Sequence, residues 1–193
     1  MSAASRPRYT VEEYVRFEQH ANARHEYVDG QIIGMGGGTF EHARLAVAVS
    51  TALAVQLQGK RCAVASSDAR IRIQATGLIT YPDVVGVCGN LEFDPDDPLA
   101  VTNPIVLAEV TSPSSEAYDR GEKFDHYKQI ASLREYIIVN HRESRIEVHR
   151  RGDDGAWSLS EAANADPLTQ RIVAITSIGC DLNVDDVYRD PLA

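Results

Sequence analysis

The sequence predicts a single mixed α/β domain, and three observations support this. The chain has 193 residues, about the size of one typical domain. Of these residues, 44% are hydrophobic and 24% are charged, which is usual for a globular protein that buries a core. Segments with helical periodicity alternate along the chain with short apolar runs typical of strands, and neither a repeat nor a long linker divides them.

The first expected elements are a helix and a hairpin. Thr10 and Glu13 have the spacing of a capping box, so a short helix should begin at this point. Asp29 and Gly30 separate two apolar stretches, which is a strong short-range signal for a β-hairpin over residues 25–33.

Further helices and strands follow from the hydrophobic pattern. Helices are expected at about 40–58 and 118–131, with a last short one near 184–187. The run 84–87 is apolar throughout, as expected for a strand covered on both faces, whereas the acidic segment 92–98 is interpreted as a solvated loop. Apolar runs or alternation predict the strands at 62–64, 69–73, 84–87, 105–111, 135–139, 145–149 and 157–159.

Charge and cysteine content narrow the class of protein. The chain has 19 lysines and arginines against 28 acids and a formal charge of -9, so a non-specific nucleic-acid coat protein is not expected. Cys62, Cys88 and Cys180 are odd in number and widely spaced, which predicts free thiols rather than a disulfide framework or a zinc site. The chain shows neither a signal-peptide core nor an apolar run of about 18 residues, so we expect a cytoplasmic protein without membrane contact.

Two acidic residues stand where the hydrophobic pattern predicts burial. Asp83 precedes the run 84–87, and Glu109 lies inside the strand at 105–111. Either acid alone could face solvent at a strand end or pair with an arginine. On neighbouring strands, however, the two could present hard oxygen ligands to Mg²⁺, which needs only one or two carboxylates.

The helix after Glu109 adds a cation. Asp119, Lys123 and Tyr127 are spaced by four and therefore share one face of that helix. A lysine near two carboxylates can orient or help to deprotonate a water molecule and can stabilise charge on a phosphate. We expect Lys123 on the flank of the helix, within reach of the strand ends. The alternative, which periodicity alone favours, is an exposed ion pair with Asp119.

Other chemistries find little support. The glycine-rich segment 34–39 lies between a strand and a helix, but Thr39 stands where a dinucleotide-binding loop needs its third glycine. The sequence contains no P-loop, no GxSxG elbow and no HExxH zinc motif. Arg70 and Arg72 share a strand face and could contact phosphates, with a solvated sheet edge as the alternative.

The order and spacing of these motifs resemble the Uma2 family, a bacterial family of proposed restriction endonucleases. The matching segments are Tyr9 to Tyr14, His25 to Gly30, His42, Tyr81 to Val85, Leu107 to Ser115, the spaced residues Asp119, Lys123 and Tyr127, and Leu133 to Tyr136. The resemblance extends over residues 8–189, which we expect to form one Uma2-like domain with tails at 1–7 and 190–193.

This resemblance implies a restriction-endonuclease-like core of the PD-(D/E)xK type, with a mixed β-sheet flanked by helices and an N-terminal helix-hairpin extension. Asp83 and Glu109 match the two acids of that superfamily. Its lysine would stand two residues after Glu109, where this chain has Thr111 on the same strand face. Lys123 on the following helix is the candidate to replace it.

The implied function is a DNA endonuclease that depends on Mg²⁺ or Mn²⁺. Asp83 and Glu109, with the Val110 carbonyl, would hold the metal, and Lys123 would position the attacking water. Residues that could also line the site, each with an ordinary structural role as its alternative, are Glu26, Glu41, His42, Asp68, Thr111, Asp119 and Tyr127.

Alternatives to this function remain open. The chain could be an inactive nuclease-fold protein that binds nucleic acid or a protein partner, or a metal-dependent hydrolase of another substrate. A homodimer is expected because enzymes that cut both strands are often paired by symmetry.

Overall fold

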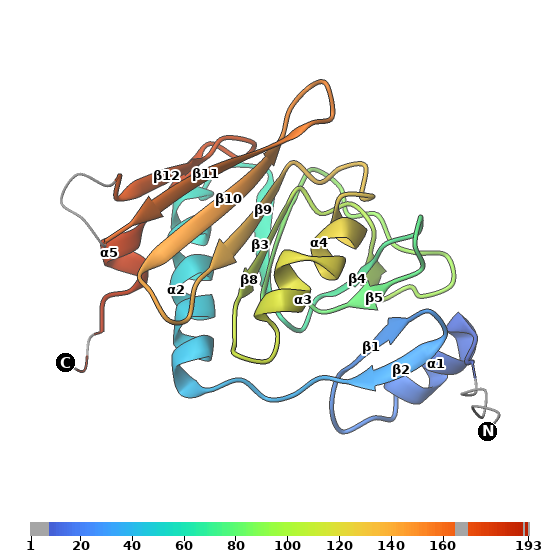
Figure 1. Cartoon of the computed structure of the whole chain (residues 1–193). Coiled ribbons are helices and arrows are strands. Elements are labelled where there is room, and N and C mark those ends of the chain that lie inside the picture. The colour runs from blue at the N-terminus through green and yellow to red at the C-terminus, as the bar shows by residue number, and fades with distance from the viewer. Residues whose placement is uncertain (1–7, 165–169, 191, 193) are drawn as a thin grey trace.

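The computed structural model describes residues 8–164, 170–190 and 192, so the expected tail at 1–7 lies outside the described residues. A six-stranded sheet forms the centre of the molecule, in the order β11-β10-β9-β8-β6-β3 (Figure 1). Neighbouring strands are antiparallel except β8 and β9, which are parallel, so the sheet is mixed. Its strands are β3 (Cys62–Ser66), β6 (Val84–Cys88), β8 (Val106–Val110), β9 (Glu135–Val139), β10 (Arg145–Arg151) and β11 (Trp157–Ala163).

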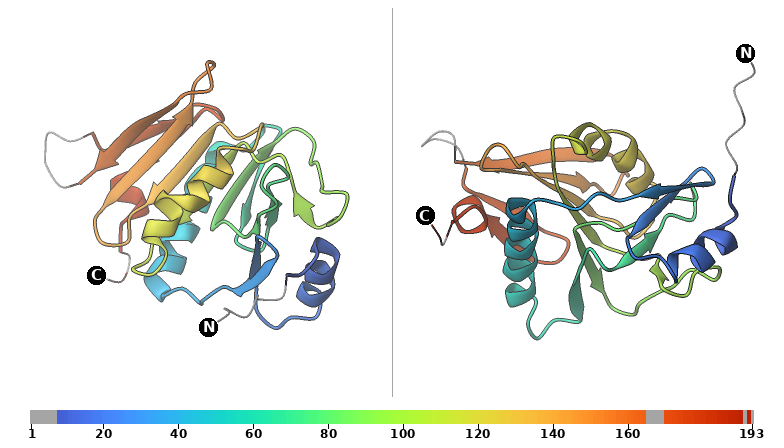
Figure 2. Two further views of the ribbon diagram at one scale, coloured as in Figure 1. Left: turned by 45° about the vertical axis from the view of Figure 1, so that its right-hand side comes forward. Right: turned by 90° about the horizontal axis from the view of Figure 1, so that it is seen from below.

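Helices cover both faces of this sheet (Figures 1 and 2). Side chains alternate across each strand, so Val84 packs with Leu45 in one core while Val85 packs with Phe124 in the other. Burial from both sides explains why β8 and β9 are apolar almost throughout. The first face carries α2 (Phe40–Gln56), β12 (Ile172–Ile175), β13 (Cys180–Asn183) and α5 (Val184–Val187), and the second carries α3 (Glu116–Arg120) and α4 (Glu122–Tyr127).

A second, five-stranded sheet attaches the N-terminal extension to the core. It consists of β2 (Gln31–Gly34), β1 (His25–Val28), β5 (Ile79–Thr80), β4 (Arg70–Arg72) and β7 (Ala100–Val101). The helix α1 (Val11–Glu18) packs on it through Tyr14 and Val15, which form a small core with Tyr27 and Ile79. The helix and hairpin therefore continue the folded body of the chain.

The local signals at the N-terminal end are confirmed. The capping box is present, with the Glu13 amide donating to Thr10 Oγ1 and the Thr10 amide donating to Glu13 Oε2. At the hairpin turn, Asp29 and Gly30 have φ values of 49° and 79°, the left-handed pair that a two-residue hairpin of this kind requires.

Two local expectations are wrong. The helix expected at 118–131 is two short helices, because Gly121 between them has φ -112° and ψ -103°, outside the helical region. The segment 92–98 is not simply a solvated loop. Its Asp97 is buried and accepts a 2.7 Å ion pair from Arg70, so Arg70 lies neither at a solvated edge nor free to contact phosphate.

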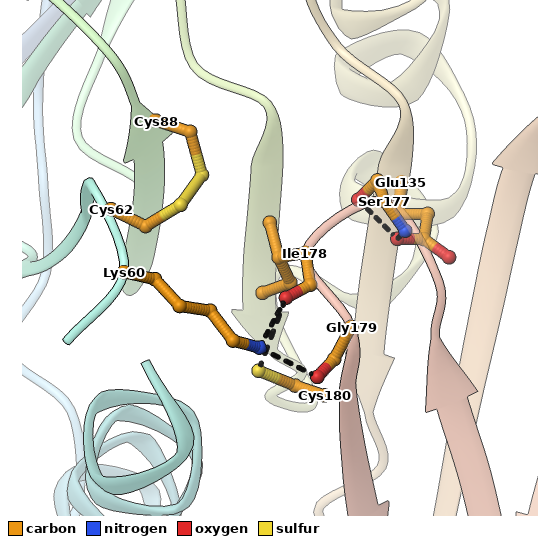
Figure 3. The surroundings of a disulfide bond; sticks show 8 residues. All are labelled: Lys60, Cys62, Cys88, Glu135, Ser177, Ile178, Gly179 and Cys180. Atoms are coloured by element: carbon orange, nitrogen blue, oxygen red, sulfur yellow. Dashed lines mark hydrogen bonds between the residues drawn. A yellow bond between two sulfur atoms is a disulfide. The ribbon is translucent and has the colours of Figure 1, made fainter. Parts of the chain in front are cut away.

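The cysteine expectation is also corrected. Cys62 and Cys88 lie directly opposite each other on β3 and β6 and form a disulfide, with their Cα atoms 4.0 Å apart (Figure 3). Only Cys180 is free, and it is buried. Sequence spacing could not reveal the bond, because the pairing of two strands brings the cysteines together. Within the described residues, no helix is both long and apolar enough to cross a membrane.

Candidate active site

Asp83 and Glu109 converge at the junction of β6 and β8. These strands pair with Val84 opposite Ala108, which places Asp83, one residue earlier, beside Glu109, one residue later. The Val110 amide donates to Asp83 Oδ2 at 2.8 Å, and the Asp83 amide lies 3.4 Å from Glu109 Oε2. The two carboxylates are therefore held next to each other by the backbone of both strands.

His42 joins these acids from the first turn of α2. Its Nε2 lies 3.2 Å from Asp83 Oδ2. The hydrogen bond to Asp83 raises the pKa of His42, although burial opposes the charged form. Gly38 makes room for the ring, since a Cβ there would come within 2.8 Å of His42 Nδ1.

Lys123 lies at the centre of the site, whereas the sequence predicts it on the flank of its helix. Its Nζ is 2.8 Å from Glu109 Oε1, 3.3 Å from Glu26 Oε1 and 3.9 Å from Asp119 Oδ1. Burial opposes its charge, but the surrounding carboxylates outweigh burial and raise the pKa of Lys123. The carboxylates around Lys123 therefore favour the ammonium form of its side chain.

Glu109 is buried with this cation. Its Oε1 accepts a second hydrogen bond from the Tyr127 hydroxyl, at 2.7 Å. Burial raises the pKa of Glu109 to about 8 even though Lys123 favours the ionised form. Burial also raises the pKa of Asp119. The site thus holds more carboxylates than Lys123 alone can neutralise.

A cavity of about 550 Å³ opens above these groups. The β1 hairpin contributes Glu26, whose carboxylate accepts a hydrogen bond from the Thr80 hydroxyl as well as the Lys123 ion pair. The candidate site residues that line the cavity are Glu26, Glu41, His42, Asp83, Glu109, Thr111, Asp119 and Lys123. Tyr127 contacts the site through its hydrogen bond to Glu109 and through its ring, whose centroid lies 6.0 Å from Lys123 Nζ.

Two candidates are less involved than expected. Asp68 is not brought to this cavity, because its exposed side chain pairs with Arg24 at 2.9 Å. Glu41 lines the cavity, but its half-exposed carboxylate is bound by Arg44 at 2.6 Å. Asp68 therefore has an ordinary structural role, in the turn between β3 and β4.

Sequence reasoning missed His141, which also lines the cavity. Arg142 Nε donates to His141 Nε2 at 3.1 Å, so the ring carries its proton at Nδ1, 2.8 Å from Thr111 Oγ1. His141 follows β9, and parallel strands β8 and β9 end at the same edge of the sheet. Because the ends of parallel strands lie side by side, residues just after β9 could have been predicted to lie near the site.

The donor set at Asp83 and Glu109 fits a hard divalent cation. Among the described residues, Asp83 Oδ1 accepts no hydrogen bond, and only the distant Asp83 amide approaches Glu109 Oε2. Within the same part of the chain, no three His, Cys, Asp or Glu side chains form a complete ligand set. Two carboxylates with water are nevertheless a usual environment for Mg²⁺.

Comparisons with known proteins bear on the family and the fold. Two Synechocystis sp. (strain ATCC 27184 / PCC 6803 / Kazusa) proteins, “Uncharacterized protein slr1290” and “Uncharacterized protein sll1609”, are 37% and 32% identical to this chain. The alignments cover 95% and 79% of this chain and 93% and 86% of the relatives.

The crystal structure of a “putative nuclease belonging to DUF820” from Anabaena variabilis ATCC 29413 superposes with a TM-score of 0.73 at 13% identity. It covers 93% of this chain and 97% of its own, which confirms the expected fold class. A model of the Uma2 family, described as “Putative restriction endonuclease”, matches residues 11–184. The chain belongs to the Uma2 family.

Proposed function

We propose that this protein is a nuclease that hydrolyses DNA phosphodiester bonds with Mg²⁺ or Mn²⁺. The observation that carries the proposal is the meeting of Asp83 and Glu109 beside the buried Lys123 at the floor of one cavity. The family description and the fold shared with the Anabaena “putative nuclease” support the same class of reaction.

Asp83 and Glu109, with the Val110 carbonyl, would hold the metal ion. A bound divalent cation supplies positive charge to the phosphate oxygens and lowers the pKa of a coordinated water. Such an ion would also compensate the excess carboxylate charge that Lys123 leaves unneutralised, which explains why several acids are gathered out of water.

The protein's own residues would then orient the reaction. Lys123 favours the ionised form of Glu109 and, as an ammonium that lines the cavity, would position the attacking water. His42 holds a proton at Nε2, where it donates to Asp83 Oδ2 and fixes that carboxylate. Thr111 occupies the strand position of the missing lysine and supplies a hydroxyl there, bonded to His141.

Plasmid cleavage with Mg²⁺ or Mn²⁺ tests the proposal. We expect Asp83→Ala and Glu109→Ala to lower cleavage by about a hundredfold or more, as loss of a metal-holding group does. Asp125→Ala is the matched control, because Asp125 is an exposed acid that pairs with Lys128. Cleavage that survives in both site variants would refute the assignment.

One observation favours a second candidate, an inactive nuclease-fold protein that binds nucleic acid. The acids already have partners within the chain, since His42 and the Val110 amide bind Asp83 while Lys123 and Tyr127 bind Glu109. Calorimetry with Mn²⁺ separates the two candidates. DNA binding without Mn²⁺ binding or cleavage would support the inactive protein.

A further inference from the structure

Tyr118 belongs to α3 and lines the cavity of the candidate site. Its hydroxyl oxygen is buried and has no hydrogen-bond partner among residues 8–164, 170–190 and 192. Because a buried hydroxyl that leaves water without gaining a partner destabilises the fold, native proteins keep few such groups. At a candidate active site, an unpaired donor points to a partner that arrives with the substrate.

The unpaired hydroxyl of Tyr118 is an exception in this chain. Apart from the exposed Tyr9, the remaining tyrosines each donate a hydrogen bond to an oxygen of the protein, namely Tyr14, Tyr27, Tyr81, Tyr127, Tyr136 and Tyr188. In the part of the chain that the structure describes, one other buried side-chain atom lacks a hydrogen bond. This atom is Arg72 Nε, which lies 3.9 Å from the Asp94 carboxylate and therefore has a charged neighbour.

The surroundings of Tyr118 favour an anion as the partner of its hydroxyl. The centre of its ring lies 5.8 Å from Lys123 Nζ, the ammonium that binds Glu109. Burial and the Glu26 carboxylate raise the pKa of Tyr118, against the effect of Lys123, so the phenol keeps its proton at neutral pH. A phenol hydrogen beside an ammonium can bind an oxygen that carries negative charge, and tyrosine is among the residues that donate to phosphate oxygens.

We propose that the Tyr118 hydroxyl donates a hydrogen bond to a non-bridging oxygen of the phosphodiester group that is cleaved. The proposal rests on the proposed function, because the phosphodiester must enter this cavity. Tyr118 is then a substrate-binding residue beside Lys123, in addition to the acids that would hold the metal. Its hydroxyl gains a partner when the substrate binds, so the unpaired hydroxyl of the free protein favours binding.

Urea denaturation tests whether the hydroxyl is unpaired in the folded chain. Tyr118→Phe keeps the ring and removes the hydroxyl, so we expect it to unfold at the same urea concentration as the wild type or at a higher one. Tyr27→Phe is the matched control and should unfold at a lower concentration, because the Tyr27 hydroxyl donates to the Tyr9 carbonyl at 2.8 Å. A loss of stability in Tyr118→Phe as large as that in Tyr27→Phe would show a partner within the chain and overturn the proposal.

Cleavage of duplex DNA with Mg²⁺ tests the contact with the substrate. We expect Tyr118→Phe to lower kcat/KM by about tenfold or more, as loss of a hydrogen bond to a charged group does. Tyr27→Phe should cleave like the wild type, since Tyr27 does not line the cavity and points to the other face of β1 from Glu26. A wild type that does not cleave DNA would overturn both proposals, whereas Tyr118→Phe that cleaves as fast as an active wild type would overturn this one alone.

Sulfur substitution identifies the phosphate as the group that Tyr118 contacts. Duplexes are prepared in which sulfur replaces one non-bridging oxygen of each phosphate, in the Rp or the Sp form. Because sulfur is a weak hydrogen-bond acceptor, one of the two forms should slow the wild type more than it slows Tyr118→Phe, which has already lost the bond. If each form slows both proteins by the same factor, the hydroxyl does not bind a non-bridging oxygen and the proposal is wrong.

Discussion

Lys123 Nζ lies 2.8 Å from Glu109 Oε1, and both groups are almost wholly removed from water. Each stabilises the charged form of the other, and burial works against both. Removing one partner of a buried ion pair leaves the other as an uncompensated charge, which costs far more than the pair contributes. Substitution of either Lys123 or Glu109 alone should therefore lower the stability of the fold.

We expect Lys123→Met to lower the free energy of unfolding by about 3–5 kcal/mol, because Glu109, Glu26 and Asp119 lose their shared cation. Adding Glu109→Gln should recover part of this loss, since one buried charge disappears with its partner. Urea denaturation of the single and double variants measures the coupling. Lys128→Met, at an exposed pair, is the control and should change stability by less than about 1 kcal/mol. Strictly additive effects would show that the two residues do not interact.

The two site acids could be found from the sequence because the hydropathy pattern shows which segments are buried. Asp83 and Glu109 stand out against apolar runs, and the structure places both beside one cavity. The position of Lys123 was harder to predict. Helical periodicity shows which residues share a helix face, but it does not show how deeply that face is buried. The break at Gly121 divides the expected helix, and α4 packs on the sheet through Phe124 and Tyr127, with Lys123 enclosed between acids.

Contacts between segments that are far apart in the chain could not be predicted from the hydropathy pattern. Cys62 and Cys88 are 26 residues apart, and Arg70 and Asp97 are 27 apart. Each pair depends on how the β-strands align, which a single sequence does not specify. Glu26 is similar, because it reaches Lys123 only after β1 has paired with β5.

The disulfide should contribute measurably to stability. Closing a loop of this length in the unfolded chain corresponds to about 3.5 kcal/mol in the chain-entropy model. We therefore expect Cys62→Ser with Cys88→Ser to unfold at lower urea concentration than the wild type. Cys180→Ser removes a free buried thiol and leaves the cross-link intact. Thiol titration of the unfolded, unreduced wild type should find one free thiol, and three would contradict the bond.

Gly38 should set the position of His42. A Cβ at residue 38 would lie 2.8 Å from His42 Nδ1, whereas one at Gly37 would meet nothing within 4 Å. Gly38→Ala should therefore displace the imidazole from Asp83, and under the proposed function it should slow cleavage by about tenfold or more. Gly37→Ala, in the same segment, should cleave like the wild type. Crystal structures of both variants would show whether the ring has moved, and an unmoved ring in Gly38→Ala would contradict the assignment.

His149 should make the fold sensitive to acid. Its ring packs 4.6 Å from that of Phe124, and burial lowers the pKa of His149 in the folded chain. Arg120 and Lys128 lower it further, against the opposing effect of Glu147. An unfolded histidine titrates near 6.5, so below that pH the unfolded chain binds the proton more readily than the folded chain.

The stability that neutral His149 provides is thus complete above about pH 6.5 and is lost as the pH falls towards the lower folded pKa. His149→Phe keeps an aromatic ring beside Phe124 but removes the titrating group. Urea denaturation at pH 7 and pH 5 should therefore show a larger loss for the wild type than for the variant. Because every other titrating group is common to both proteins, equal losses would mean that His149 does not contribute to the acid response.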